Sequence, residues 1–321
     1  MLPPFRTALL LTLGAMASTD APPVVVEYPI PRPGSFPHDP TVAPDGMVYY
    51  TDQANSYIGR LDPGTGRFVD WATPTPGSGP HGLDVAPDGS VWYTAQRVGM
   101  LGRLDPATGV IEEFPLPAEA PYPHTPVVYQ GKVWFTDANS HTYGALDPAT
   151  GRAQVWHAMA GSVPYGLRPA PDSALWIAFL GTNALGRVDA RDGSLRTFRL
   201  PDPGARPRRL AVAPDGRVYY TDYARGYLGR LDPRTGTVDE WPTPTPRSGP
   251  YGITLGTDGR VWYNEAASGL MVAFDPGTER METVRIPTAG AVVRHIVTDT
   301  LRHRVWLALS GTGRLGMIAL P

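Results

Sequence analysis

Short β-rich runs of hydrophobic residues, separated by polar turns, recur along the chain with a period of about 43 residues. Each run follows a tight turn and carries an aromatic residue at its second position, as in Val48-Tyr49-Tyr50 and Val91-Trp92-Tyr93. The turns are Asp-Gly or degraded forms of it, and they stand at Asp45-Gly46, Asp88-Gly89, Gln130-Gly131, Asp172-Ser173, Asp215-Gly216, Asp258-Gly259 and Arg302-His303. Seven equivalent units are typical of stacked or radial repeats.

Each unit divides into four short strands. In the second unit they span residues 82–86, 91–94, 100–104 and 111–114, joined by Asp-Gly and Asp-Pro-x-Thr-Gly turns of the kind that tight hairpins require. No segment has a helical period with caps, so we predict almost no helix. The sequence therefore predicts an all-β protein, a seven-bladed β-propeller with four-stranded antiparallel blades, as one domain over residues 18–321.

The two ends of the chain predict how the ring closes. Residues 24–29 resemble the fourth-strand segments at 238–242 and 68–71, and the last unit stops after its third strand. We expect the N-terminal strand to complete the last blade, which would remove two exposed sheet edges.

Composition narrows the function. The formal net charge is −2, the only lysine is Lys132, and the arginines are scattered, so no basic stripe for nucleic acid is visible. Nothing indicates a nucleotide or flavin cofactor. The chain has no cysteine, which excludes disulfides and thiolate chemistry. A signal peptide is predicted over residues 1–17 from Arg6, the apolar stretch 8–17 and the small-x-small pattern Ala15-Met16-Ala17. The apolar stretch is too short to span a membrane comfortably. We expect a periplasmic or secreted monomer with no transmembrane segment beyond that peptide.

Propeller geometry predicts where polar side chains converge. The start of each first strand and the end of each second strand lie at the same end of the blade, around the mouth of the central channel. The residues before the first strands are His38, His81, His124, Tyr165, Arg208, Tyr251 and Arg294. The residues at the ends of the second strands include four acids, Asp52, Asp137, Asp222 and Glu265. A concave mouth with convergent polar groups is a candidate site for a small-molecule or peptide ligand.

Several chemistries are open at this mouth. His38, His81 and His124 lie on consecutive blades and could act as bases or converge on a transition metal. The four acids could bind a divalent cation, magnesium or calcium, through oxygen. Alternatively, the polar groups are solvated, or the arginines and acids only pair with each other. The repeated tryptophans keep one phase of the repeat and are expected to pack between blades.

The repeats themselves resemble a known family. The segments 249–254 and 258–265, with Pro80-His81-Gly82-Leu83 and Ile58-Gly59-Arg60-Leu61, are similar to the repeat of the streptogramin B lyase (virginiamycin B lyase) family. The resemblance implies a seven-bladed propeller that opens a cyclic depsipeptide at its ester by elimination, with a histidine base and a magnesium ion. It also places a substrate-side tyrosine at Tyr165 and Tyr251.

The chain departs from the family at the chemical centre. The family's base lies in a Glu-Pro-His-Gly motif, but here Gly79 precedes Pro80, and the last blade, where the motif usually stands, has Arg294 at the ring position. In the family, a further carboxylate follows the second strand of the same blade, but here that strand ends in Ala95-Gln96. The pair of carboxylates that binds magnesium in the family is therefore not reproduced on any single blade. Elimination would therefore use His81 or His38 as the base, with an arginine as the electrophile, either Arg208 or Arg294.

Two other functions compete with elimination. Lactonases of the gluconolactonase type are also propellers, with a calcium ion held by channel-mouth oxygen ligands, and the four acids suit such a hydrolase. The third hypothesis is an exported module that binds a peptide or other ligand without chemistry. Elimination ranks first because the repeat matches the lyases best.

Overall fold

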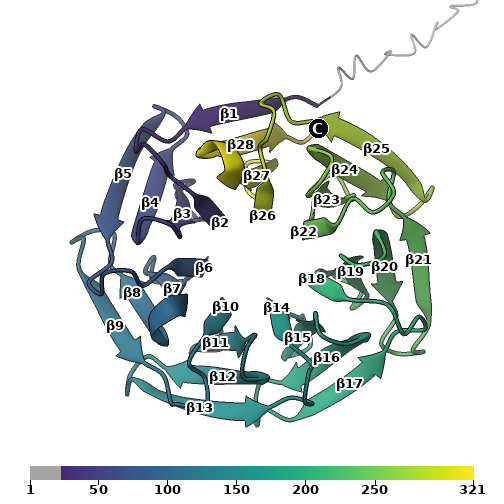
Figure 1. Cartoon of the computed structure of the whole chain (residues 1–321), viewed down its shortest axis with the longest axis horizontal. Coiled ribbons are helices and arrows are strands. Elements are labelled where there is room, and N and C mark those ends of the chain that lie inside the picture. The colour runs from purple at the N-terminus through teal and green to yellow at the C-terminus, as the bar shows by residue number, and fades with distance from the viewer. Residues whose placement is uncertain (1–22) are drawn as a thin grey trace, which may run out of the picture.

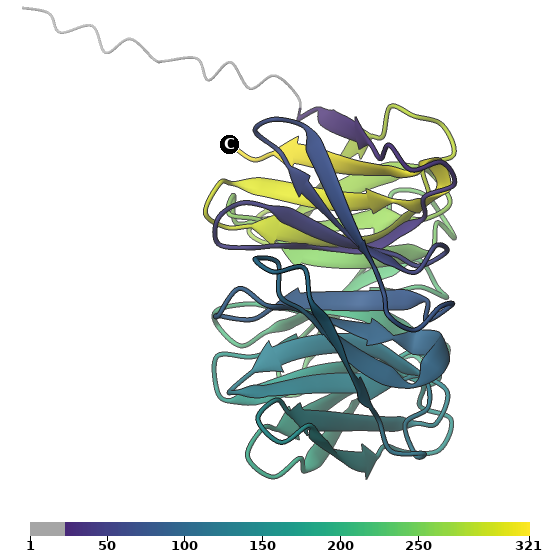
Figure 2. The same cartoon turned by 90° about the vertical axis from the view of Figure 1, so that its left-hand side faces the viewer.

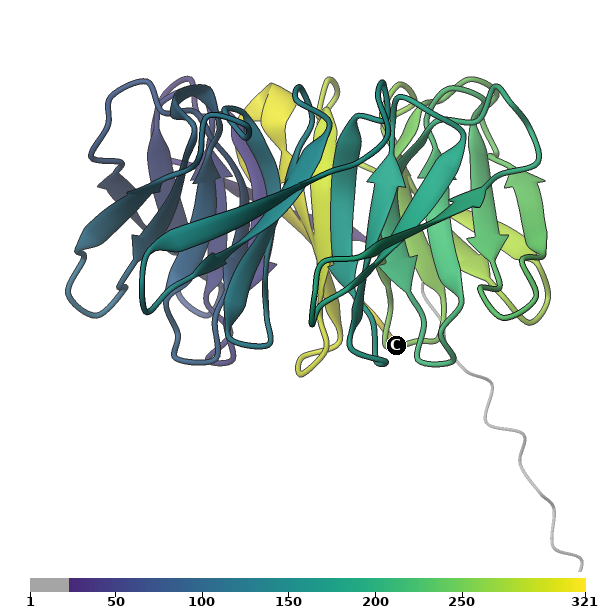
Figure 3. The ribbon, with the colours of Figure 1, turned by 90° about the horizontal axis from the view of Figure 1, so that it is seen from below.

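The computed structural model describes residues 23–321, so the predicted signal peptide lies outside the described residues. Seven four-stranded sheets stand around a central axis (Figure 1). Viewed from the side, they form a short disc (Figures 2 and 3). The prediction of a seven-bladed propeller is confirmed. Among the described residues, no helix is long and apolar enough to cross a membrane.

Each blade runs from an inner strand to an outer one. The inner strands are β2 (Pro37–Val42), β6 (Pro80–Val85), β10 (Pro123–Tyr129), β14 (Pro164–Pro169), β18 (Pro207–Val212), β22 (Pro250–Leu255) and β26 (Val293–Asp299). The second strands are β3 (Val48–Asp52), β7 (Val91–Ala95), β11 (Lys132–Asp137), β15 (Ala174–Phe179), β19 (Val218–Asp222), β23 (Val261–Glu265) and β27 (Arg304–Leu309).

The two outer layers complete the sheets. The third strands are β4 (Tyr57–Asp62), β8 (Met100–Leu104), β12 (Thr142–Asp147), β16 (Ala184–Asp189), β20 (Tyr227–Leu231), β24 (Leu270–Asp275) and β28 (Arg314–Ala319). The outermost strands are β5 (Arg67–Ala72), β9 (Ile111–Pro115), β13 (Arg152–His157), β17 (Leu195–Arg199), β21 (Val238–Pro242), β25 (Arg280–Arg285) and β1 (Val25–Pro29). The only helices of residues 23–321 are two 3₁₀ turns, Gln96–Val98 and Ser310–Thr312.

The last blade is closed by the first strand, as expected. β1 pairs antiparallel with β28, with Val25 opposite Ile318, and forms the outer edge of the sheet that contains β26 and β27 (Figure 1). Val25 is buried, and the Tyr28 ring lies 5.5 Å from the Trp306 ring. The chain thus fastens its two ends together inside one sheet.

The turn and strand residues of the repeat have clear structural reasons. Gly46 in the Asp45-Gly46 turn has φ +93°, which favours glycine, and the Asp45 carboxylate accepts the Met47 backbone N–H at 2.9 Å. In the Gly-Arg-Leu segment of β4, Gly59 lies under the Tyr50 ring, where a Cβ atom would come within 2.1 Å of the ring. The repeated tryptophans of the second strands are buried, as predicted.

Side chains of the second strands also fasten one blade to the next at the channel. The Thr51 hydroxyl accepts the Asp39 backbone N–H at 3.1 Å and donates to the His81 carbonyl of the neighbouring blade at 2.7 Å. In the next blade, the Thr94 hydroxyl accepts the Gly82 backbone N–H at 3.0 Å and donates to the His124 carbonyl at 2.9 Å. These bridges hold the backbone of the residues at the channel mouth.

Candidate functional site

The residues predicted at the channel mouth form one ring. Each is the second residue of an inner strand, and the ring contains His38, His81, His124, Tyr165, Arg208, Tyr251 and Arg294. The histidines and tyrosines are buried, whereas the two arginines are partly exposed. The structure therefore brings together all of the predicted histidine candidates in one place.

Half of the ring is a continuous stack of flat side chains. The His38 and His81 rings lie 3.9 Å apart between centroids, His81 and His124 also 3.9 Å, and His124 and Tyr165 3.8 Å. Tyr165 shares a 2.7 Å hydrogen bond with the Tyr251 hydroxyl. The stack places imidazoles of three consecutive blades in direct contact at the mouth.

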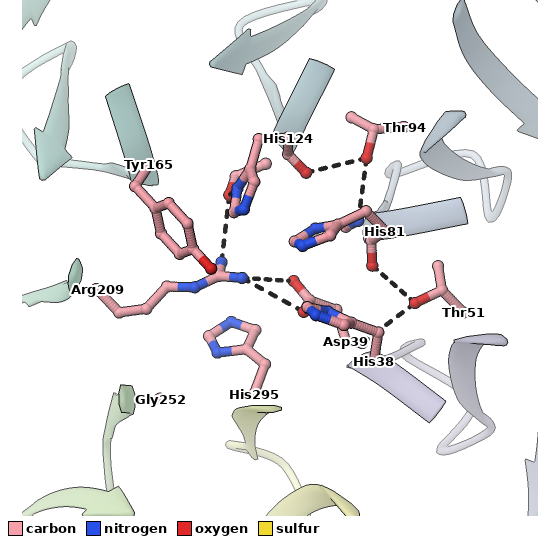
Figure 4. A network of polar contacts seen from close by, with 12 residues as sticks. His38, Asp39, Thr51, His81, Thr94, His124, Tyr165, Arg209, Gly252 and His295 are labelled. Atoms are coloured by element: carbon pink, nitrogen blue, oxygen red, sulfur yellow. Dashed lines mark hydrogen bonds and ion pairs between the residues drawn. The ribbon is translucent and has the colours of Figure 1, made fainter. Parts of the chain in front are cut away.

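Just inside the mouth, a buried ion pair crosses the channel. Arg209 reaches from β18 to β2, with its Nη2 3.1 and 3.3 Å from the two carboxylate oxygens of Asp39 (Figure 4). Its Nη1 donates to the Thr125 hydroxyl at 3.2 Å. Arg209 is 1% exposed and Asp39 2%. Burial alone would raise the pKa of Asp39, but the Arg209 charge holds that pKa well below its usual range. Asp39 is therefore an anion at neutral pH.

Asp39 also orients a histidine. The His38 Nδ1 lies 2.8 Å from an Asp39 carboxylate oxygen. Because a carboxylate only accepts, Nδ1 carries the proton and Nε2 keeps the lone pair. Burial lowers the pKa of His38, although Asp39 acts in the opposite direction. A neutral imidazole oriented by a carboxylate is the arrangement used by general bases.

His81 differs from its neighbour. Its Nδ1 is buried and has no hydrogen-bond partner within residues 23–321, and burial together with His124 lowers its pKa well below the usual range. Among the described residues, one group could hold a metal ion, with ligand atoms of His38, Asp39 and His81 within 4.8 Å of one another. His124 is not part of that group, and Asp39 already neutralises Arg209.

The four acids predicted as metal ligands lie apart from this group. Asp52, Asp137, Asp222 and Glu265 are buried at the ends of their second strands, each on a different blade. Each accepts a backbone N–H from the loop that leads into its own blade, and Asp222 also pairs with Arg225 at 2.6 Å. These contacts give the acids a role in holding the loops. The structure does not bring them together in one cation site.

The sequence predictions missed the second layer of the channel. The third residues of the inner strands include Asp39, Thr125, Arg209 and His295, whereas the other three blades have glycine there. At Gly82 a Cβ atom would come within 2.8 Å of the His124 carbonyl oxygen, so glycine lets the neighbouring strand approach. The sequence feature that could have revealed this layer is that four repeats have another residue where the other three have glycine. These non-glycine positions are the ones whose side chains fill the channel.

Next to the ion pair lies a cavity with a volume of about 200 Å³, and Asp39 is part of its lining. Its lining includes Asp84, Arg168 and His295, and Arg168 Nη2 is 2.6 Å from His295 Nε2. Burial raises the pKa of Asp84 to about 6, and burial together with Arg209 lowers the pKa of Arg168 to about 10. The lining of this cavity contains none of the ring residues of the mouth.

The buried histidines make stability depend on pH. Burial lowers the pKa of His38, His81, His124 and His295 in the folded protein. Below the unfolded value of about 6.5, only the unfolded chain binds these protons, so stability is lost as pH falls. Each such proton contributes a slope of up to about 1.4 kcal/mol per pH unit.

Asp84 acts in the opposite direction. Its folded pKa of about 6 is raised, so the stability that it contributes is present at low pH and lost as pH rises through about 6. One acid offsets only part of the stability that the four histidines lose as pH falls, so we expect a lower melting temperature at pH 5.5 than at pH 7.5. His81→Asn should flatten this dependence, and the exposed His157→Asn should not. Equal melting temperatures at both pH values would contradict the prediction.

The fold is shared with solved lyases. A virginiamycin B lyase from Staphylococcus aureus superimposes with a TM-score of 0.87 at 24% identity, over 94% of this chain and 100% of that one. A structure of a streptogramin B lyase gives a TM-score of 0.86 at 26% identity, over 93% and 98% of the two chains. A catalytically inactive virginiamycin B lyase variant from S. aureus with quinupristin gives a TM-score of 0.87 at 24% identity, over 94% and 100%.

The sequence comparisons agree with the structural ones at the family level. No curated protein is matched by the sequence. The virginiamycin B lyase family matches residues 14–150 and 126–320, which together span nearly the whole chain and all seven blades. The chain belongs to the virginiamycin B lyase family.

Proposed function

We propose that this protein is a carbon–oxygen lyase that opens a cyclic ester, such as a cyclic depsipeptide, by elimination at the histidine-lined mouth. His38 is the candidate base. The observation that carries the proposal is the Asp39–His38 pair, which keeps Nδ1 protonated and leaves Nε2 as the basic nitrogen. Membership of the lyase family supports the same reaction class.

The proposed step balances without an added reactant. His38 Nε2 takes the proton from the carbon next to the one that bears the ester oxygen. The electrons of that C–H bond form a C=C bond, and the C–O bond breaks with its electron pair on the departing carboxylate. His38 then releases its proton to solvent. The lowered pKa of His38 keeps the imidazole in its basic form near neutral pH.

Magnesium, which the family resemblance implies, does not fit the residues present. Mg²⁺ prefers several oxygen ligands in octahedral geometry. The carboxylate beside the ring histidines is Asp39, and it is already paired with Arg209. The acids of the second strands are engaged in separate loops. We therefore assign no step to a metal. The ring arginines instead stabilise the negative charge of the departing carboxylate.

The test is mass spectrometry of a streptogramin B antibiotic incubated with the protein, with magnesium and with a chelator. Ring opening without a change in mass is expected for elimination. Opening with the gain of one water would instead identify a hydrolase, and an untouched antibiotic would contradict lyase activity on this substrate and favour a binding module.

The base is tested by substitution. His38→Ala should lower the rate of opening by about 10²-fold, because a positioned general base contributes at least that much. The exposed His157→Ala is the matched control and should leave the rate unchanged. An unchanged rate in both His38→Ala and His81→Ala would remove these two ring histidines as candidate bases.

A further inference from the structure

The ring at the mouth is chemically divided. Blades with β2, β6, β10 and β14 contribute the neutral stack from His38 to Tyr165, whereas the blades with β18 and β26 contribute the guanidinium groups of Arg208 and Arg294. These two arginines flank Tyr251 in ring order. One half of the mouth therefore offers bases, and the other half offers positive charge.

Arg208 is held rigidly by aromatic rings. Its guanidinium carbon lies 3.8 Å from the Tyr251 ring centroid, 4.2 Å from that of Tyr223 and 5.0 Å from that of Tyr165. One Nη donates to the Tyr165 hydroxyl at 3.0 Å. Rings that cover the faces of a guanidinium leave its edge for a planar partner, and they line the slot with apolar surface.

Neither mouth arginine has a carboxylate partner among residues 23–321. The Nε atoms of Arg208 and Arg294 are both buried without a hydrogen-bond acceptor. Two other enclosed arginines are neutralised: Arg209 by Asp39, and Arg225 by Asp202, Asp222 and Glu240. Because Arg208 and Arg294 are partly exposed and no carboxylate within the described residues neutralises them, their charge is available to an external anion.

Arg294 also lies close to the candidate base. Its guanidinium carbon is 5.7 Å from the Phe36 ring centroid, and the His38 ring centroid is 6.4 Å from that of Phe36. The Arg294 charge contributes to lowering the pKa of His38, after burial and the Arg209 charge. A ligand that contacts His38 can therefore reach a guanidinium of the same ring.

We propose that Arg208 and Arg294 form a carboxylate-binding site that takes the carboxylate released when the ester is eliminated. A guanidinium edge matches the two oxygens of a carboxylate, and the aromatic walls suit an organic acid with an apolar body. The role as leaving-group site rests on the proposed elimination, but carboxylate binding itself does not. The site would supply the positive charge that the bond cleavage requires.

Binding is measured by calorimetric titration with N-acetylphenylalanine and with its neutral amide, which share one aromatic body. We expect the acid to bind at least about tenfold more tightly than the amide. Arg208→Gln and Arg294→Gln should each weaken binding of the acid about tenfold or more and leave the amide unchanged, as expected for a lost charge-assisted hydrogen bond. Arg208→Lys keeps the charge but loses the planar edge, and should also weaken binding.

The exposed Arg97, in the 3₁₀ turn Gln96–Val98, offers the matched control: Arg97→Gln should bind both probes normally. Melting temperatures establish that the variants are folded, and Arg294→Gln carries the test if loss of the tyrosine-stacked Arg208 unfolds the protein. Equal affinity for acid and amide, or unchanged binding in both glutamine variants, would overturn the site. Displacement of the acid by equimolar inorganic phosphate would also overturn it, in favour of an unselective anion site.

The two proposals fail separately. An untouched antibiotic with selective binding of the acid would reject the lyase function and keep the carboxylate site. Opening of the antibiotic with equal binding of acid and amide would reject the site and keep the reaction.

Discussion

Replacing Asp39 with alanine should destabilise the protein by about 3–5 kcal/mol, because Arg209 then keeps a buried charge without a counter-ion. Arg209 is 1% exposed, and its remaining side-chain partner is the neutral hydroxyl of Thr125. The measurement is the free energy of unfolding from urea titration at pH 7.5.

A double-mutant cycle separates the ion pair from other effects. Arg209→Met alone should also destabilise, since it leaves Asp39 buried and unpaired. The Asp39→Ala/Arg209→Met double variant should lose clearly less than the sum of the two. The exposed pair of Arg260 and Glu282 is the matched control, and Glu282→Ala should change stability by about 1 kcal/mol at most. Additive losses in the cycle would show that the cross-channel pair contributes no coupling.

Removal of β1 should destabilise the whole ring. A chain that begins at Pro31 should melt about 10 °C or more below one that begins at Pro23. Deletion exposes the sites of Val25 and Ile30, each worth roughly 1.5–3 kcal/mol when buried. It also leaves β28 as an open edge and removes the Glu27 carboxylate from the Thr288 backbone N–H, which it accepts at 3.0 Å.

Point variants distinguish this closure from an effect of chain length. Val25 is 4% exposed and Val26 is 45% exposed on the same strand. Val25→Asp should therefore lower the melting temperature strongly, because it buries a carboxylate in an apolar contact, and Val26→Asp should change it little. Equal melting temperatures for the Pro23 and Pro31 chains would show that the ring is held without β1.

The fold was predictable because its information is local and repeated. An Asp-Gly turn, or a degraded form of it, and a hydrophobic strand recur in each unit, so one unit interpreted correctly predicts the others. The residues at the mouth were predictable for the same reason, since one position of the repeat always faces the channel. The closure by residues 24–29 followed from their likeness to the outer strands elsewhere, as at 238–242.

The chemistry of the channel was not predictable in this way. Asp39 and Arg209 lie 170 residues apart, and their contact depends on how far each side chain extends across the channel. The second-strand acids occupy a repeat position as regular as that of the ring, so sequence alone could not distinguish a metal ligand from a group that holds a loop. Only the departures from glycine at the third position, such as Arg209, pointed to the inner layer.

The pairing of β1 with β28 means that the ring has no structurally privileged starting point. Val25 and Ile318 face each other as neighbours in the outer and third strands of one sheet. In the second blade, residues 105–110 connect the corresponding strands β8 and β9. A similar short connection could join the end of β28 to the start of β1, and the chain could then be opened in the outer connection of another blade. Circular permutation would thus move the termini around the disc and leave the histidine and arginine ring in place.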